Sequence, residues 1–268
     1  MRELIITDLR RMFKDKLLLI ACIIGAAFSL ISPLLYQLLF GLLDMGDMLG
    51  LIVNAKTQYF ESFSPANNFG MIAPVFIAVI ICKDFSYGTV RNKIISGHSR
   101  TEIYFSILVS SAVVLTAVML AHALLTLLFS LVFFEYQAEP FGVNDLLYFL
   151  LSTLFEILVC ILIAATVSFL AAITKNIGLS IVGFFGINFL FLIVGSITMV
   201  AVQFADPDDI LHGVLECIND ANVFTSTVIG HGTTYDLREI LCILVPTVGG
   251  TALLSLFGNI LFGKKDLK

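Results

Sequence analysis

Six long apolar segments restrict the possible folds of this chain more than any other feature of its sequence. A helix needs about 20 mostly apolar residues to cross a bilayer. Only 13% of the residues are charged and 59% are hydrophobic, so these helices cannot all present a polar side to water. We therefore expect an all-α, multi-pass membrane protein rather than a soluble enzyme, a disulfide scaffold or a nucleic-acid-binding protein. The expected spans are 17–43, 64–82, 103–134, 145–173, 177–204 and 238–262.

The second span is the weakest of the six. Its apolar core, 69–82, would cover only about 21 Å as a helix, so it must take residues 64–68 from its flank or re-enter. Lys and Arg in short loops mark the cytoplasmic side. If 64–82 crosses the membrane, every Lys and Arg except Lys56 and Arg238 lies in a terminal segment or a loop on the same side. We therefore expect six crossings in the cell membrane, with both termini in the cytoplasm.

Residues 1–16 repeat apolar side chains at helical spacing. Leu4, Leu9 and Met12 alternate with Asp8 and Arg11, a pattern typical of a helix that lies in the membrane interface. The alternative is that this segment continues the first span into the cytosol.

The basic connection 83–102 predicts a short amphipathic helix between two stops. Gly97 suits a left-handed helix end, and Ser99 with Glu102 forms a capping box for the third span. A corner of this kind is stiff enough to transmit force from a partner, although an ordinary positive-inside turn is the alternative. The apolar stripe of the helix comprises Tyr87, Val90, Ile94 and Ile95.

The outer connections show no folded domain. In 205–237, Asp206 and Pro207 predict the start of a helix, and 44–68, with Leu49, Ile52 and Val53, is expected to rest on the outer surface. The apolar face of the helix expected in 205–237 comprises Ile210, Leu211, Val214, Leu215 and Ile218. Asp208, His212 and Glu216 have the spacing of metal ligands, but any solvated helix face gives it, so we expect no metal site.

The chain contains no G-x-x-x-x-G-K-[ST] phosphate loop and no common catalytic motif. We expect no enzymatic activity and no cofactor in this chain. Two ionisable residues within spans, His122 and Glu156, are expensive enough in hydrocarbon to be functional candidates. We hypothesise that they face each other at similar depth, with Ser152 and Thr153 extending the polar face. The alternative is a neutral Glu156 bonded to backbone.

The 83–102 connection and the six-span topology resemble the permease subunit of small bacterial type-2 ABC transporters. Gly97 and His98 stand where that family commonly has a proline before its Ser-Arg pair. The resemblance implies two permease chains in membrane lipid and two separate ATPase subunits that bind ATP and Mg²⁺. The motif positions are Asp84, Gly88, Thr89, Ser99 and Arg100.

On this resemblance the 84–100 corner docks on the ATPase, and the cargo is an exported antimicrobial or other amphipathic peptide or an apolar compound. The coupling residues it implies are Asp84, Tyr87, Gly88, Thr89, Arg91, Lys93, Ser99 and Arg100. Two other functions remain open. One is an ATP-independent secondary transporter with a proton relay at Glu156 and His122, and the other is a non-transporting membrane scaffold or sensor.

Overall fold

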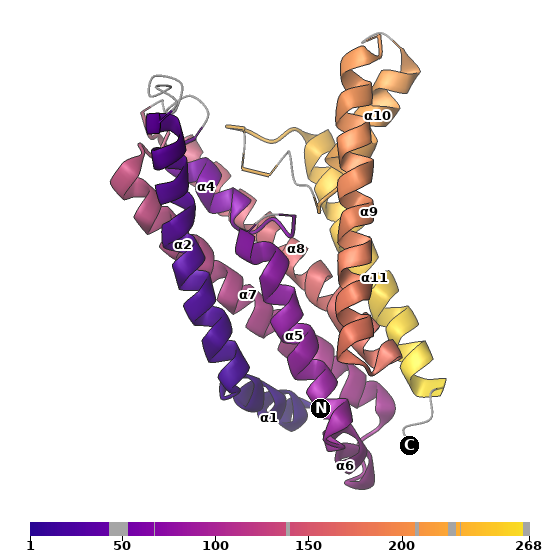
Figure 1. The fold of residues 1–268 in the computed structure, drawn as a ribbon. Coiled ribbons are helices and arrows are strands. Elements are labelled where there is room, and N and C mark those ends of the chain that lie inside the picture. Colours follow the sequence, from indigo (N-terminus) through magenta and orange to yellow (C-terminus); the bar gives the residue numbers. More distant parts are fainter. Residues whose placement is uncertain are drawn as a thin grey trace.

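The structure is a computed structural model. It describes residues 1–42, 53–66, 68–137, 140–206, 209–224, 229–230 and 232–264. Within these ranges every regular element is a helix (Figure 1). The helices are α1 (Arg2–Phe13), α2 (Lys16–Leu42), α4 (Ala55–Glu61), α5 (Asn68–Ser86), α6 (Thr89–Ile95), α7 (Arg100–Phe133), α8 (Val143–Thr174), α9 (Ile177–Phe204), α10 (Ile210–Asp220) and α11 (Leu237–Lys264).

Among the described residues six helices are long and apolar enough to cross a membrane: α2, α5, α7, α8, α9 and α11. The all-α, multi-pass architecture is thus confirmed. The second span differs from its predicted bounds, because α5 gains length at its C-terminal end and includes Lys83 and Asp84. Residues 62–66 are not helical, and Pro65 disfavours a helical conformation for Ser64 before it.

Helices α7 and α8 form the centre of the bundle. Helix α7 packs against α1, α2, α4, α5, α8 and α11, and α8 also packs against α5, α9 and α11. Membrane helices associate through close packing and interhelical hydrogen bonds. Between these two helices the hydroxyls of Ser111 and Ser168 lie 2.7 Å apart. By contrast, α9 and α11 leave many large apolar side chains exposed, as expected for surfaces that face lipid or another chain.

Helix α4 corrects the expectation for 44–68. Val53, Tyr59 and Phe60 are buried inside the bundle, where α4 packs against α7 and α8, rather than resting on an outer surface. Leu49 and Ile52 lie outside the described residues. The aromatic side chains supply enough apolar area to bury a helix whose sequence is otherwise polar.

The helix in the last long connection starts later than predicted. The N-cap of α10 is Asp209 rather than Asp206, whose carbonyl accepts a 3.0 Å hydrogen bond from the Asp209 N–H. Pro207 and Asp208 lie outside the described residues. His212 and Glu216 are 3.8 Å apart, and within the part of the chain that is described no cluster of three metal-ligating side chains occurs.

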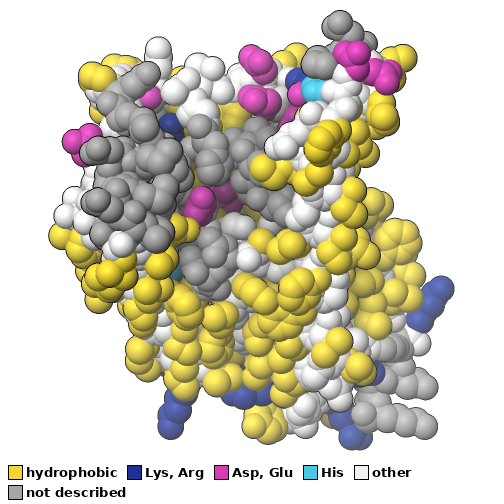
Figure 2. Space-filling view, turned by 45° about the horizontal axis from the view of Figure 1, so that its top comes forward, with side chains coloured by type: hydrophobic (Ala, Val, Ile, Leu, Met, Phe, Trp, Pro, Cys, Tyr) yellow, Lys and Arg dark blue, Asp and Glu magenta, His cyan; other side chains and the backbone are white. Residues whose placement is uncertain are grey.

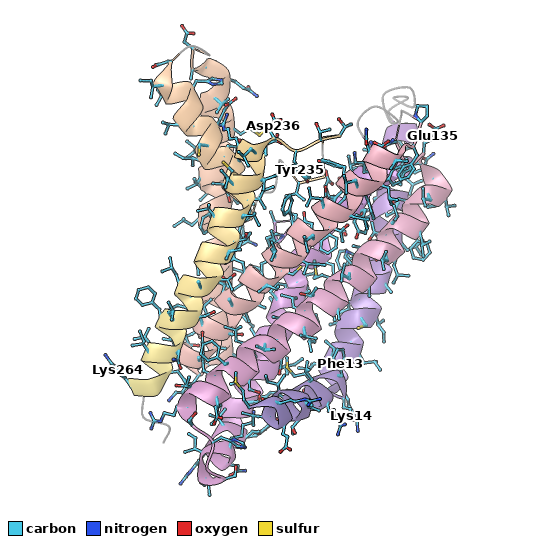
Figure 3. The ribbon with its side chains drawn as sticks, turned by 180° about the vertical axis from the view of Figure 1, so that it is seen from behind. Phe13, Lys14, Glu135, Tyr235, Asp236 and Lys264 are labelled. Carbon is cyan, nitrogen blue, oxygen red and sulfur yellow. The ribbon has the colours of Figure 1, made fainter. Side chains whose placement is uncertain are left out.

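Charge separates the two ends of the bundle. In Figure 2, Lys and Arg gather at one end, Asp and Glu at the other, and a hydrophobic belt lies between them. We call the first the basic end, which holds α1, α6 and the last turn of α11, and the second the acidic end. Figure 3 shows Phe13, Lys14 and Lys264 at the basic end, with Glu135 and Tyr235 at the acidic end.

Candidate functional site

The corner between α5 and α7 is built from three helix-end motifs. Gly88 is the N-cap of α6 with φ +70°, and Gly97 follows α6 with φ +93°, conformations that glycine adopts without steric cost. The N–H groups of Gly97 and His98 donate to the carbonyls of Ile94 and Lys93 at 3.0 and 3.2 Å, the two bonds of a Schellman motif. The left-handed end at Gly97 is therefore confirmed.

Ser99 completes the corner as the N-cap of α7. Its hydroxyl accepts from the Glu102 N–H at 3.2 Å, and the Glu102 carboxylate accepts from the Ser99 N–H at 3.0 Å. This is the predicted capping box. The chain therefore enters α7 at a fixed direction.

Helix α1 binds this corner through a buried ion pair. Lys93 of α6 donates to both carboxylate oxygens of Asp8 at 2.6 and 2.8 Å, and the Ser106 hydroxyl of α7 donates to the same carboxylate at 2.6 Å. Asp8 and Lys93 have side-chain exposures of only 2% and 10%. Charge-assisted bonds of this kind are strong and directional, so α1, α6 and α7 are joined at one point.

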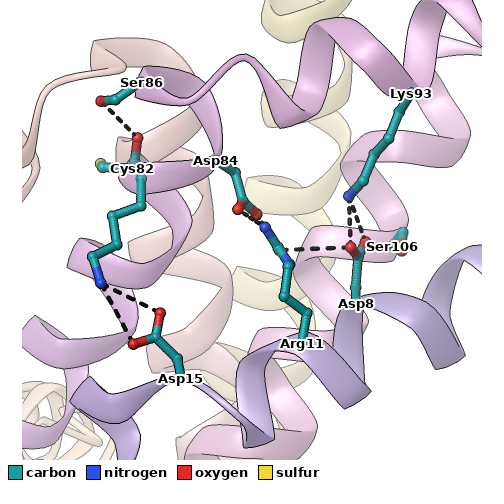
Figure 4. A network of polar contacts seen from close by, with 9 residues as sticks. Asp8, Arg11, Asp15, Cys82, Asp84, Ser86, Lys93 and Ser106 are labelled. Carbon is teal, nitrogen blue, oxygen red and sulfur yellow. Dashed lines mark hydrogen bonds and ion pairs between the residues drawn. The ribbon is translucent and has the colours of Figure 1, made fainter.

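Two further pairs extend the contact to α5. Arg11 contacts both carboxylate oxygens of Asp84, and Lys83 lies 3.4 Å from Asp15, just after α1. Burial lowers the pKa of Lys93 and of Arg11, and neighbouring carboxylates oppose that shift. Figure 4 shows these contacts. We call them the elbow network, which comprises Asp8, Arg11, Asp15, Lys83, Asp84, Lys93 and Ser106.

The structure of the N-terminal segment excludes the alternative to a separate helix and corrects one expectation. Helix α1 ends at Phe13 and α2 begins at Lys16, so the segment does not continue the first span. Asp8 also does not face away from the bundle, because it is buried together with Leu4 and Met12. The spacing of these three residues, four apart on one helical face, is the one feature of the sequence that could have revealed this.

Several coupling residues implied by the resemblance hold the corner in place. Asp84 and Lys93 belong to the elbow network, and Ser99 caps α7. Arg100 donates to the Gly263 carbonyl at 2.8 Å, which ties the start of α7 to the last turn of α11, where a cation is favoured. These side chains position the corner, and the buried ones among them present little surface to a partner.

The remaining residues divide the predicted apolar stripe into two faces. Val90 is buried and Ile94 half-buried, whereas Tyr87 and Ile95 are 77% and 74% exposed. Arg91 is also exposed, while Gly88 and Thr89 are half-buried in the turn. We call Tyr87, Arg91 and Ile95 the outer elbow face. Ile95 was not among the predicted site residues, although its spacing of four from Arg91 places both on one helical face.

His122 does not pair with Glu156 in the described part of the chain. Its Nδ1 lies 2.7 Å from the Ser29 hydroxyl and 3.0 Å from the Gly25 carbonyl of α2. The Phe69 ring of α5 lies 4.8 Å from the imidazole, centroid to centroid. His122 therefore joins α7 to α2.

Glu61 is the acid that lines a small cavity together with His122. A cavity between α2, α4 and α7 is lined by both side chains and by Ser32, Gln58 and Thr126. Its volume of about 10 Å³ corresponds to roughly one water molecule. Burial raises the pKa of Glu61. The sequence alone places Glu61 in the outer connection 44–68, because its pattern does not predict α4.

Glu156 lies 1% exposed on α8. The pKa of Tyr59 on α4 is raised mainly by burial, and the charge of Glu156 adds to the shift. The predicted polar neighbours bind tyrosines: Ser152 lies 2.7 Å from the Tyr235 hydroxyl, and Thr153 lies 3.2 Å from that of Tyr59. The polar surface around Glu156 therefore connects α8 to α4 and to the segment before α11.

Comparison with protein families gave one assignment. The model of a family described as a protein of unknown function, DUF2705, matches residues 18–267. The chain belongs to the DUF2705 family. Comparisons with curated proteins and with solved structures gave no match.

The DUF2705 match covers only part of the elbow network. Lys83, Asp84, Lys93 and Ser106 lie within the matched region, whereas Asp8, Arg11 and Asp15 precede it. His122 and Glu61 also lie within the matched region. The family region thus contains the corner itself, and α1 adds the charges that fix it.

Proposed function

We propose that this DUF2705 protein is the permease subunit of an ATP-driven transporter of the type-2 ABC class. A separate ATPase subunit supplies the work and binds ATP and Mg²⁺, and a second permease chain completes the membrane unit. The cargo is an amphipathic peptide, such as an antimicrobial peptide, or an apolar compound that the transporter exports. In this arrangement the basic end faces the cytoplasm, in agreement with the distribution of Lys and Arg.

One observation supports this proposal more than any other. The corner between α5 and α7 is fixed to the bundle by the buried Asp8–Lys93 pair and the rest of the elbow network. Its opposite side, the outer elbow face, is exposed. A surface that receives force must be attached rigidly to the spans that it moves. The pairs attach α6 to α1, α5 and α7, so a push on the outer elbow face acts on three helices at once.

The test is co-purification of the tagged full-length chain with an ATPase that carries a phosphate loop, after cross-linking in the native membrane. Arg91→Glu reverses an exposed charge at the centre of the outer elbow face. We expect recovery of the ATPase to fall about tenfold or more, as for a central interface residue.

Lys14→Glu is the matched control, because Lys14 is an exposed basic residue at the same end of the bundle. It should leave recovery of the ATPase near the wild-type level. Unchanged recovery with both Arg91→Glu and Ile95→Asp would show that the outer elbow face is not a docking surface. Transport by the purified chain without ATP would contradict the proposal as a whole.

The cavity shared by Glu61 and His122 favours a second candidate, a secondary transporter that moves protons. Two ionisable side chains that line one small cavity between the spans α2 and α7 and the buried helix α4 form the kind of site that proton relays use. The relay acid would be Glu61 in place of the predicted Glu156. Vesicles that contain only this chain should then take up protons down a pH gradient, and Glu61→Gln should abolish the uptake.

A further inference from the structure

A short segment at the acidic end is attached firmly to the bundle. Residues 232–236 precede α11, and three contacts hold them against α4 and α8. The Gly232 N–H donates to the Tyr148 hydroxyl at 2.9 Å, Lys56 donates to the Gly232 carbonyl at 2.7 Å, and the Tyr235 hydroxyl lies 2.7 Å from that of Ser152. We call residues 232–236 the strap. Figure 3 shows Tyr235 on the strap beside the bundle.

Stacked aromatic rings stiffen the attachment of the strap. The rings of Tyr148 and Tyr235 lie 4.6 Å apart with an interplanar angle of 17°. The Lys56 amine lies 4.7 Å from the centroid of the Tyr148 ring, and the Phe155 ring meets Tyr235 edge-on at 5.2 Å. Because each tyrosine is held both by its ring and by its hydroxyl, the two rings form a fixed wall.

A cavity of about 250 Å³ lies against this wall, between the strap and the first turns of α8 and α11. The two tyrosine rings and the side chains of Leu147, Leu151 and Ile240 form its apolar lining. An apolar cavity of about 150 Å³ is large enough to bind benzene. The space beside the strap therefore accommodates one bulky apolar group, up to the size of an aromatic amino-acid side chain.

The rest of the lining is polar but uncharged. Asn144, Thr233 and Thr234 contribute an amide and two hydroxyls, and all three residues are exposed. Among the described lining residues none is ionisable except the buried or half-buried tyrosines. Binding pockets commonly combine an apolar interior with a few polar groups that orient the ligand. This lining suits a neutral hydrogen-bonding group next to an apolar one.

We propose that the strap cavity binds the bulky apolar or aromatic group of an amphipathic, peptide-like ligand, with an adjacent neutral amide placed against Asn144 and the two threonines. The proposal deepens the export function and rests on it for the identity of the ligand as cargo. Binding itself requires neither ATP nor an ATPase, so the two proposals can fail separately.

The experiment uses the absence of tryptophan from this chain. The full-length protein is reconstituted in phosphatidylcholine vesicles, and N-acetyl-tryptophanamide is added as the probe. All indole emission then comes from the probe, and protein-free vesicles give the background. We expect a saturable blue shift and a rise in anisotropy with wild-type protein.

Leu151→Phe fills the cavity and should weaken probe binding about tenfold, because overpacking a fixed cavity is costly. Leu150→Phe makes the same change at a neighbouring position that is 57% exposed and outside the lining, and it should change the affinity less than about twofold. Thr234→Tyr blocks the cavity from its exposed rim and serves as a second variant whose fold is easily retained.

Three results would overturn the proposal. The first is a signal that never exceeds that of protein-free vesicles. The second is equal affinity in wild type, Leu151→Phe and Thr234→Tyr. The third is saturable binding in short-chain detergent that disappears in phosphatidylcholine, which would identify a lipid chain as the occupant. An ATPase that fails to co-purify would contradict the export function without changing any of these binding results.

Discussion

Removing Lys93 tests the elbow network most directly. Lys93→Met keeps a long apolar stem of similar size and deletes only the ammonium group. The Asp8 carboxylate, whose side chain is 2% exposed, then loses both of its bonds to Lys93. It retains the Ser106 hydroxyl at 2.6 Å and the Arg11 guanidinium at 3.6 Å. Water cannot easily replace the lost bonds, because the site is closed by α1, α6 and α7.

The cost follows from this burial. Breaking a buried ion pair by removing one partner costs about 3–5 kcal/mol. Since two partners of Asp8 remain, we take the lower limit of about 3 kcal/mol, which corresponds to a change of roughly a hundredfold in an equilibrium constant. The loss should fall on the docking of α1, because α1 touches the rest of the chain mainly through α7 and the elbow network.

Amide hydrogen exchange measures this docking locally. In Lys93→Met the amides of α1 should exchange about a hundredfold faster than in wild type, since local opening sets their protection. Amides in the middle of α7 should keep their protection. Lys14→Met removes an exposed ammonium from the residue after α1 and should leave exchange in α1 within about twofold of wild type.

A double variant distinguishes the ion pair from simple packing. Replacing a buried pair with apolar side chains is often neutral, so Asp8→Leu combined with Lys93→Met should recover most of the lost protection. Unchanged exchange in Lys93→Met would refute the reasoning, as would a double variant that exchanges as fast as the single one.

Two further predictions concern the packing of α11 against α7 and the buried carboxyl group of Glu61. A Cβ at Gly258 of α11 would overlap the Tyr104 side chain, whereas Gly249 of the same helix faces open space. Gly258→Ala should therefore lower the free energy of unfolding by about 1–3 kcal/mol, and Gly249→Ala should not. Equal melting temperatures for the two variants would contradict this packing. Burial raises the pKa of Glu61, so the folded state keeps this proton to higher pH than the unfolded state. The contribution of Glu61 to folding stability is complete below the ordinary pKa of 4.5 and is lost as pH rises through the raised pKa. Glu61→Gln should flatten the dependence of Tm on pH in that window. An unchanged profile would contradict the burial of a protonated Glu61.

The spans and the corner could be predicted because local sequence determines them. Length and apolar content define a helix that crosses a bilayer, and Gly97, Ser99 and Glu102 specify the ends of two helices through contacts within a few residues. These signals do not depend on the rest of the fold. The bounds of the spans accordingly differ from the structure mainly at α5, where neighbouring Pro65 and a charged C-terminal turn decide the ends.

The elbow network and α4 could not be predicted, because they depend on contacts between distant parts of the chain. Asp8 and Lys93 are 85 positions apart, and periodicity alone cannot say which helix covers a given face. The predicted pairing of His122 with Glu156 is wrong for the same reason. Equal depth in neighbouring spans does not fix the rotation of each helix, and His122 turns toward α2 instead.

The two ends of the bundle are connected through α7 and α8. Helix α7 starts at the elbow and, with 34 residues, spans about 51 Å. Helix α8 packs along α7 and carries Tyr148 and Leu151 of the strap cavity. No proline interrupts either helix within its described bounds.

Long unbroken helices move as rigid bodies more readily than they bend. On the proposed function, a push on the outer elbow face would therefore be transmitted along α7 to α8, and it would change the distance between the wall of the cavity and α11. On this proposal α7 and α8 connect the 83–102 corner at one end of the bundle with the strap cavity at the other. The elbow network, which joins α1 to α5, α6 and α7, keeps the corner attached to these helices.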